Sequence, residues 1–387
     1  MLKPSVIQSL PTLTGPVLSV YLDTDRAKKR NRGVKPGYLI RLKSQAKSIA
    51  QTVSAEEQEL FRKRLQRTEG YLQSRPPKCR GVIIFAGLNT WKFVPLQVEV
   101  EDEIHWGRPA LAQLLWLLEE HEAYGIVVAG RKRVRFFLYK LGEVRELEEK
   151  EFRLEPSKKK EMGPVARPGV RLSRGTNRDV FERHLAAEYS HYHQEIAKRV
   201  EHWCAAEPLK SLFLVGLAEM VKAIRKEIPS ILAQKIVLIE ADLGWVSRTD
   251  LLNRIDPAIA QHRRKCELAS VEALLGDSQN AVMGVDQVLV QLQQGKVRSV
   301  VVTKAMSETL QQCASCSWAD RRSDSLCPAC GGRRHSVELR EVFPELVRRC
   351  NVSLEVVSGD AAQKLQEAGG MGAWLREFEK KEYSAIA

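Results

Sequence analysis

Short apolar runs alternate with longer amphipathic stretches along the first part of the chain. Three runs are β-branched or glycine-bounded, as expected of buried strands: residues 16–22, 81–87 and 125–130. Residues 38–73 and 109–121 have the three-to-four-residue spacing of helices, and 134–138 is a further strand candidate. This pattern predicts an N-terminal α/β domain over residues 1–150.

A second α/β pattern follows and defines a central domain, residues 151–278. Its long helix, 179–204, has a stripe of large apolar residues at steps of three or four: Leu185, Tyr189, Tyr192, Ile196, Val200 and Trp203. Strand-like runs at 211–216 and 235–240 lie on either side of a helical pattern at 218–233.

The last part of the chain predicts a third α/β domain, residues 279–387. We expect a helix at 281–294 and a strand at 297–303, then an insert that contains four cysteines. A helix at 342–350, a strand at 353–357 and a closing helix at 361–379 complete it. The predicted fold class is therefore α/β, in three domains.

The charge balance points to a polyanionic partner. Lys and Arg number 61 against 48 Asp and Glu, a formal net charge of +13, which favours nucleic acid or an anionic membrane surface. No apolar run approaches the ~20 residues that span a bilayer, so we expect no membrane segment. Without a visible secretory signal, and with four of the eight cysteines scattered, a reduced, cytoplasmic protein is expected.

Residues 153–178 form a basic stretch that proline and glycine keep irregular. It contains two acidic residues and eight basic ones: Arg153, Lys158, Lys159, Lys160, Arg167, Arg171, Arg174 and Arg178. The stretch is either a solvated linker or a mobile loop that contacts RNA, and composition alone leaves both open. A shorter basic loop near the N-terminus contains Lys28, Lys29 and Arg30.

The cysteine insert has the spacing of a zinc ribbon, which we place at residues 311–337. Cys313 and Cys316 form one CxxC pair, and Cys327 and Cys330 form another, with ten residues between the two pairs. Two such turns can present four thiolates to one Zn²⁺, with no open position for catalysis. Because the insert has few large apolar residues, the structural metal would supply its folding free energy. Coincidental cysteines and a redox pair are the alternatives.

Several segments resemble the archaeo-eukaryotic class-1 release factor and pelota superfamily, including its bacterial members. They are VLSVYLDT at 17–24, KIVLIEADLGW at 235–245, AVMGVDQVLVQLQQGKVRSVVVT at 281–303 and AGGMGAWLREF at 368–378, the last similar to a glycine-rich closing helix. The resemblance implies a decoding-centre-type N-terminal domain, a ribonuclease-H-like central domain and an L7Ae-like C-terminal domain with a zinc-ribbon insert.

The chain departs from that family at its reactive tripeptide. Active release factors carry Gly-Gly-Gln in the basic loop, whereas the nearest stretch here is Gly175-Thr176-Asn177. The Asn-Ile-Lys-Ser motif that reads the stop codon is also missing, and RLKSQ at 41–45 is only weakly similar to it. No Walker loop, GxSxG elbow or HExxH motif is present either. We therefore expect no catalytic residue and no enzyme activity.

What the resemblance implies is a tRNA mimic that occupies the ribosomal A site, as in Balon-type hibernation factors or rescue factors, without peptide hydrolysis. The expected partners are the 70S ribosome and its rRNA, with delivery by a translational GTPase such as elongation factor Tu, no membrane, and a monomer off the ribosome. The expected rRNA contacts are Lys158, Lys159, Lys160, Arg167, Arg171, Arg174, Asn177, Arg178, Lys28, Lys29 and Arg30. The alternative is a codon-independent peptidyl-tRNA hydrolase or release factor that uses the loop around Asn177.

Overall fold

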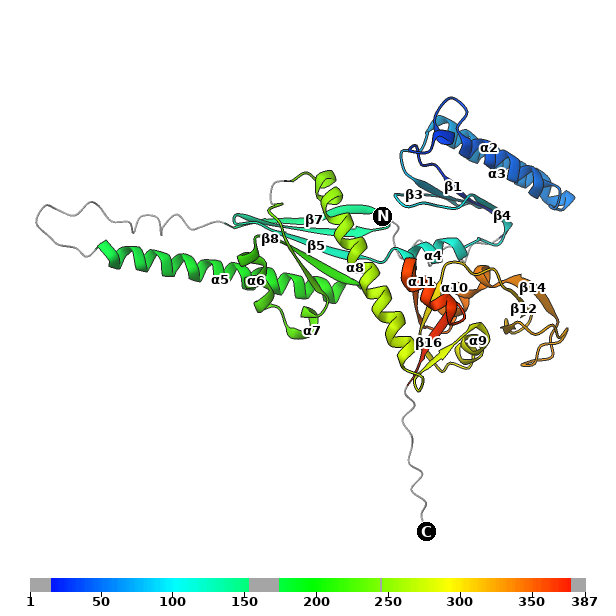
Figure 1. Ribbon diagram of the computed structural model, residues 1–387. Helices are drawn as coiled ribbons and strands as arrows, with labels where there is room; N and C mark the ends of the chain where they lie inside the picture. Colours follow the sequence, from blue (N-terminus) through cyan, green and yellow to red (C-terminus); the bar gives the residue numbers. More distant parts are fainter. Residues whose placement is uncertain (1–14, 153–173, 244–245, 377–387) are drawn as a thin grey trace, which may run out of the picture. The chain divides into compact units, whose positions relative to one another are not determined.

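The computed structural model describes residues 15–152, 174–243 and 246–376, and its fold is mixed α/β (Figure 1). The chain divides into two compact units, one of residues 122–255 and one that combines the N-terminal segment with residues 256–387. None of the described helices is both long and apolar enough to cross a membrane.

The N-terminal segment forms an antiparallel sheet with two helices on one face. The sheet order is β3-β2-β1-β4, with β1 at Val17–Asp23, β2 at Gly81–Ala86, β3 at Trp91–Leu96 and β4 at Glu103–Gly107. Helices α2 (Gly37–Ala50) and α3 (Ala55–Ser74) pack against Leu18, Val20 and Leu22 of β1. Residues 38–73 are thus two helices, because Ser54 starts a new one with Glu56 and Glu57 in its first turn.

The central sheet contains strands from both sides of the predicted boundary at residue 150. Its order is β7-β6-β5-β8-β9, with β5 at Tyr124–Ala129, β6 at Arg133–Lys140, β7 at Glu143–Glu151, β8 at Ser211–Gly216 and β9 at Ile236–Glu240. β5 pairs in parallel with β8, Tyr124 opposite Ser211. The structure therefore moves residues 124–151 from the N-terminal domain into the central one, because β5 takes its partner from β8.

The central helices follow the sequence pattern with one addition. Helix α5 (Arg174–Ala206) buries Tyr192, Ile196, Val200 and Trp203 against the sheet, as the spacing predicts. The helical pattern at 218–233 divides into α6 (Ala218–Glu227) and α7 (Ser230–Ala233), with Pro229 between them. Helix α8 (Arg248–Gly276) is not predicted by the sequence analysis, and it contains Pro257.

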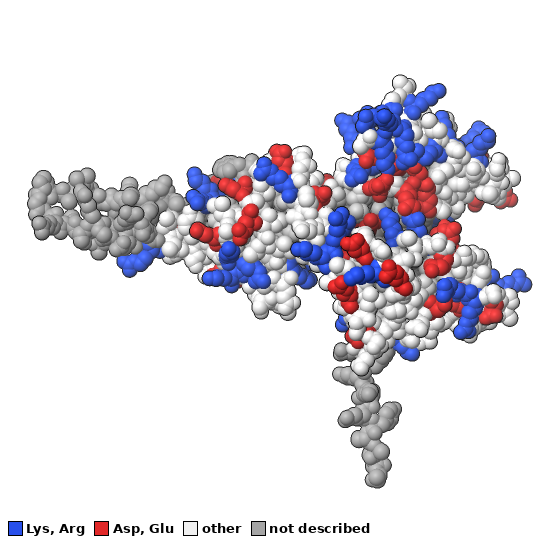
Figure 2. Space-filling view, viewed as in Figure 1, with Lys and Arg blue, Asp and Glu red and all other residues white. Residues whose placement is uncertain are grey.

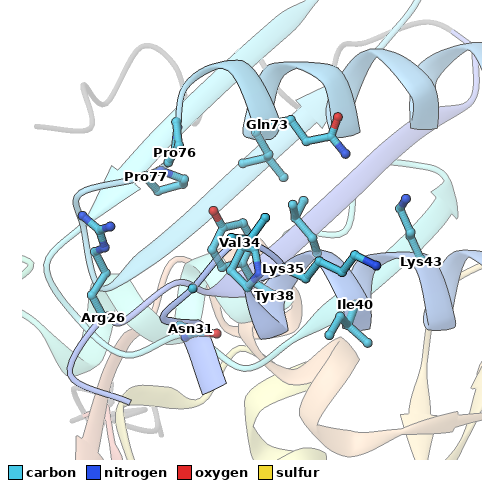
Figure 3. Close-up of a pocket in the computed structure, with 14 residues that line it drawn as sticks. Arg26, Asn31, Val34, Lys35, Tyr38, Ile40, Lys43, Gln73, Pro76 and Pro77 are labelled. Atoms are coloured by element: carbon cyan, nitrogen blue, oxygen red, sulfur yellow. The ribbon is translucent and has the colours of Figure 1, made fainter. Parts of the chain in front are cut away.

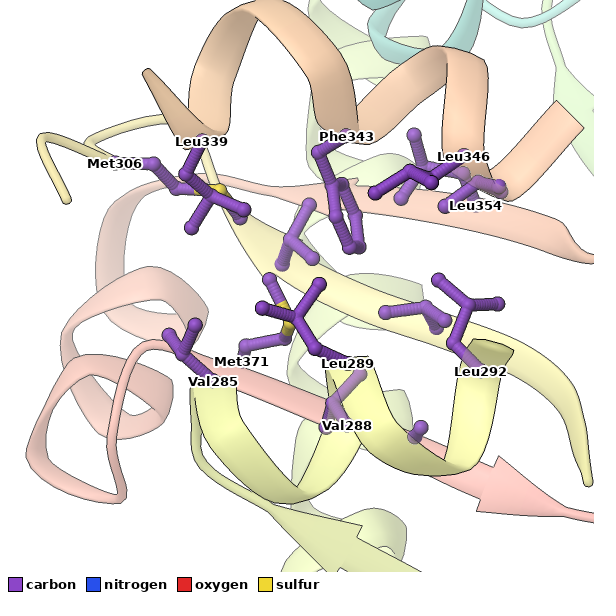
Figure 4. Packing of buried hydrophobic residues seen from close by; sticks show 14 of the residues in the cluster. Val285, Val288, Leu289, Leu292, Met306, Leu339, Phe343, Leu346, Leu354 and Met371 are labelled. Atoms are coloured by element: carbon purple, nitrogen blue, oxygen red, sulfur yellow. The ribbon is translucent and has the colours of Figure 1, made fainter. Parts of the chain in front are cut away.

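The C-terminal sheet has the order β10-β16-β11-β15, with β10 at Ala281–Met283, β11 at Val297–Thr303, β15 at Ser353–Val357 and β16 at Met371–Leu375. Helices α9 (Val285–Gln293), α10 (Leu339–Arg349) and α11 (Gly359–Glu367) accompany it, and α4 (Ala112–Glu120) contacts α10 and β15. Figure 4 shows Leu289, Phe343 and Met371 meeting in this core.

Three sequence expectations for this part need correction. The closing helix at 361–379 is instead α11 followed by β16, because Gly369 and Gly370 have positive φ and end the helix. Residues 281–294 likewise divide into β10 and α9 at Gly284. The boundary at 278 also shifts, since Val271 and Leu274 of α8 pack into the C-terminal core.

Candidate functional site

The four clustered cysteines meet at the tip of a small three-stranded ribbon. Its strands, ordered β13-β12-β14, are β12 at Thr309–Cys313, β13 at Ala319–Asp320 and β14 at Arg334–Glu338. The four Sγ atoms lie within 4.8 Å of one another. Two pairs, Cys313 with Cys330 and Cys316 with Cys327, have Sγ–Sγ distances of 3.5 Å.

Backbone N–H groups surround the sulfurs. The Ser315 N–H donates to Cys313 Sγ and the Ala329 N–H donates to Cys327 Sγ, each at 3.4 Å. Hydrogen bonds from the backbone of Cys316 and Ser315 lower the pKa of the Cys313 thiol to about 6, so it ionises readily. Gly332 also approaches closely, because a Cβ there would lie 3.0 Å from Cys313 Sγ.

This arrangement fits a tetrahedral metal centre better than a disulfide pair. Metal–sulfur bonds of about 2.3 Å give sulfur–sulfur edges of about 3.8 Å, close to the observed separations. A disulfide would need about 2.05 Å. No other His, Cys, Asp or Glu of the described residues joins the cluster. The site could therefore hold a metal such as zinc in a closed, structural role, as the spacing predicts.

The base of the ribbon is anchored to the C-terminal core without the metal. Leu310 and Ala319 are fully buried in that core. The Gln293 side chain of α9 bonds both backbone groups of Ala319, accepting its N–H and donating to its carbonyl, each at 2.7 Å. Arg334 pairs with Asp320 and donates to the Gln311 carbonyl. The expectation that the metal supplies all of the insert's folding free energy is thus too strong.

The predicted RNA contacts in the long basic loop fall largely outside the structure. Lys158, Lys159, Lys160, Arg167 and Arg171 lie outside the described residues. Residues 174–178, which include Arg174, Asn177 and Arg178, form the first turns of α5 and not part of a loop. The physical reason is that no proline lies between Pro168 and Pro208, so no proline prevents the helix from beginning at Arg174.

The N-terminal basic loop is tied to a buried carboxylate. Asp23, at the end of β1, is only 1% exposed and pairs with Lys28 (Nζ to Oδ2, 2.7 Å) and with Arg30. Burial would raise the pKa of Asp23, but hydrogen bonds from Lys28, the Asp25 N–H and Arg30 outweigh it and lower the pKa below its usual range. Two of the predicted RNA-binding cations therefore also fix the loop, while Lys29 is exposed.

We expect Asp23→Asn to lower the local stability of β1 by about 1–2 kcal/mol at pH 7, since hydrogen bonds to charged groups are strong but Lys28 and Arg30 are partly exposed. The folded pKa lies below the unfolded value of about 3.9, so this contribution is present above pH 4 and is lost as the pH falls further. Hydrogen exchange of β1 amides measures it. Glu59→Gln, at an exposed pair, is the control, and an equal effect there would contradict the prediction.

The largest basic feature of the molecule is one that the sequence analysis missed. Residues 26–80 contain sixteen Lys and Arg but four Asp and Glu, a net +12, which is nearly the whole formal charge of the chain. Figure 2 shows Lys and Arg gathered over the part that Figure 1 labels α2 and α3. Counting charge for each predicted domain, instead of searching for short basic runs, would have found it.

Some of the cations in residues 26–80 pack against aromatic rings, and others are exposed and can bind an external partner. Arg64 and Arg67 lie over the rings of Trp106 and Trp91, at 5.3 and 4.8 Å from the centroids. Lys29, Lys47 and Arg62 are exposed, and none forms an ion pair with another described residue. These three cations can therefore reach an external polyanion.

Comparison with known proteins finds one family model. Residues 109–259 match bacterial archaeo-eukaryotic release factor family 10. A comparison with curated protein sequences finds no match.

Similar solved structures include an archaeal translation termination factor, aRF1, at 15% identity, covering 96% of each chain with a TM-score of 0.24. Archaeoglobus fulgidus Pelota is 14% identical over 77% of this chain and 80% of its own, with a TM-score of 0.30. An archaeal Pelota described as ribosome-bound with ABCE1 is 17% identical over 76% and 73%, with a TM-score of 0.39.

Proposed function

We propose that this chain is a ribosome-binding translation factor of the bacterial branch of the archaeo-eukaryotic release factor and pelota superfamily, since its residues 109–259 match the model of bacterial archaeo-eukaryotic release factor family 10. The observation that carries this proposal is the concentration of charge, net +12, in residues 26–80. Phosphate groups dominate the affinity of proteins for folded RNA, and they attract such a surface without requiring sequence recognition.

The finer role that we propose is occupancy of the A site as a tRNA mimic, in ribosome hibernation or rescue in the cytoplasm, without peptide hydrolysis. The sequence supports it by departing from the Gly-Gly-Gln tripeptide at Gly175-Thr176-Asn177. Delivery by a translational GTPase such as elongation factor Tu belongs to the same proposal. The four-cysteine ribbon would hold a structural Zn²⁺.

Co-sedimentation with 70S ribosomes over a salt series tests ribosome binding. We expect the simultaneous substitutions Lys29→Ala, Lys47→Ala and Arg62→Ala to weaken binding and to reduce the slope of log affinity against log salt by about 0.7–0.9 per lost phosphate contact. The matched control removes three exposed cations elsewhere, with Lys198→Ala, Lys265→Ala and Lys296→Ala. Absence of the wild-type protein from the ribosome pellet at low salt, or equal losses in both triple variants, would contradict the proposal.

Peptide release from stalled ribosomes separates this role from the alternative, a codon-independent hydrolase. We expect no release at saturating protein. Release by the wild-type chain that Asn177→Ala abolishes would favour the hydrolase instead.

A further inference from the structure

The N-terminal basic segment contains a pocket of about 400 Å³, within the roughly 300–1,000 Å³ of small-ligand sites (Figure 3). It lies between the loop after β1, the first turns of α2 and the last turn of α3 with the residues that follow. Val34 and Tyr38 line one side, and Gln73, Pro76 and Pro77 line the other. All of these residues belong to one compact unit.

The lining combines flat apolar walls with polar groups that have no internal partner. Pro76, Pro77 and Leu39 supply apolar surface, and Val34, which is 99% exposed, adds to it. Among the described residues, neither the Gln73 amide nor the Tyr38 hydroxyl has a hydrogen-bond partner. An amide and a hydroxyl can each donate and accept, which is what the edge of a nucleobase requires.

Every charged residue of the lining is a cation. Arg26 and Lys35 form no ion pair within the described part of the chain, and Lys43 Nζ lies 3.6 Å from the Glu69 carboxylate. No Asp or Glu lines the pocket. The positive charge of the lining therefore favours an anionic ligand. The surrounding residues 26–80, with a net charge of +12, would also attract anionic groups that lie outside the pocket.

The loop that forms one wall is held in place by its own contacts. Asn31 is 3% exposed, and its Nδ2 donates to the carbonyls of Asp23 (2.9 Å) and Asp25 (3.1 Å). A Cβ at Gly37 would lie 2.8 Å from the Arg30 carbonyl oxygen, so this close approach requires glycine. A wall fixed in this way loses little conformational entropy when a ligand binds.

We infer that this pocket binds one unpaired nucleotide of an RNA strand. Its base would lie between the proline wall and Val34, its edge would bond Gln73 and Tyr38, and its phosphates would face Arg26 and Lys35. The inference rests on the proposed ribosome binding and specifies the ligand of the N-terminal surface. An acidic peptide would satisfy the cations but would leave the amide, the hydroxyl and the flat apolar walls without a matched partner.

Fluorescence anisotropy with a labelled RNA trinucleotide at fixed salt tests this. We expect Val34→Glu to weaken binding by about tenfold or more, because it replaces the apolar contact to the base with a carboxylate that also repels the nucleotide's phosphates. Leu88→Glu makes the same change at an apolar residue that is 67% exposed and outside the pocket, and it should leave the affinity unchanged. Gln73→Ala should also weaken binding, whereas Gln66→Ala, at an exposed glutamine of the same helix, should not.

Competition experiments identify the source of the nucleotide. We expect the unlabelled trinucleotide to compete at least about tenfold better than the mononucleotide, because neighbouring phosphates meet the surrounding cations. Equal competition by the mononucleotide, or by polyglutamate of matched charge, would overturn the inference. The inference would also be overturned if the trinucleotide did not bind, or if the Val34→Glu and Leu88→Glu variants bound it equally well. Either result would count even if the wild-type protein sediments with ribosomes. Failure to sediment would instead refute the proposed function.

Discussion

Replacing Cys313 by serine should reduce the zinc content from one ion per chain to nearly none. Cys313 is 1% exposed and its Sγ lies 3.5 Å from Cys330 Sγ, so its loss removes a buried corner of the tetrahedron. Structural Zn²⁺ sites of this type contribute about 10–16 kcal/mol of apparent binding free energy, and three thiolates retain only part of it. Metal analysis by mass spectrometry measures the content.

The same substitution should unfold the tip of the ribbon but not its base. The base is anchored by Leu310 of β12 and Ala319 of β13 in the core, whereas residues 323–333 lie beyond these contacts and depend on the metal. Limited proteolysis should therefore cut within 323–333, and hydrogen exchange should accelerate there. Cys350→Ser, a cysteine of the same domain outside the cluster, is the control. Full zinc content in the Cys313→Ser variant, or equal loss in the control, would contradict a four-thiolate site.

Phe343→Ala should destabilise the C-terminal core by about 3–5 kcal/mol, as expected when a buried phenylalanine is truncated. Phe343 is fully buried, and its ring stacks on that of Trp116 with centroids 6.2 Å apart and an angle of 18° between the planes. Because the substitution leaves a cavity beside Trp116, α4 should loosen together with α10. Hydrogen exchange of the β11 amides measures the loss of core stability, and hydrogen exchange of the α4 amides measures the loosening of α4.

A matched control for that substitution is Leu326→Ala. Leu326 is 59% exposed at the ribbon tip, so its truncation should change stability by no more than about 0.5 kcal/mol. If Phe343→Ala accelerates exchange in β11 but leaves α4 unchanged, then the Trp116 ring contributes little to holding α4 on this core.

The sequence predicts those elements whose stability depends on local pattern. The apolar runs at β1, β2, β5, β8, β11 and β15 are strands, because each is buried on at least one face and bounded by turn residues. The stripe on α5 is a buried helix face for the same reason. The CxxC pairs also meet as the spacing predicts, since each turn directs two sulfurs to one point.

Other elements depend on partners that are remote in sequence. β7 is strongly acidic, yet it is a strand because β6 supplies the opposite charges, with Arg135 bound to both carboxylate oxygens of Glu146 at 2.8 and 3.0 Å. β16 is a strand because β10 and β11 pair with both of its edges. Position 372 of this strand favours glycine, because the Cβ of any other residue would lie 2.4 Å from the Leu274 side chain.

The sequence by itself determined the α/β class, the thiolate cluster and the excess of positive charge, because periodicity, ligand spacing and residue counts are properties of the chain alone. Only the tertiary structure decided which sheet residues 124–151 join, that Asp23 binds Lys28 and Arg30, and that Val34 and Gln73 line one pocket. Strand pairing, ion pairs and pockets join residues distant in sequence, and local pattern does not encode those distances.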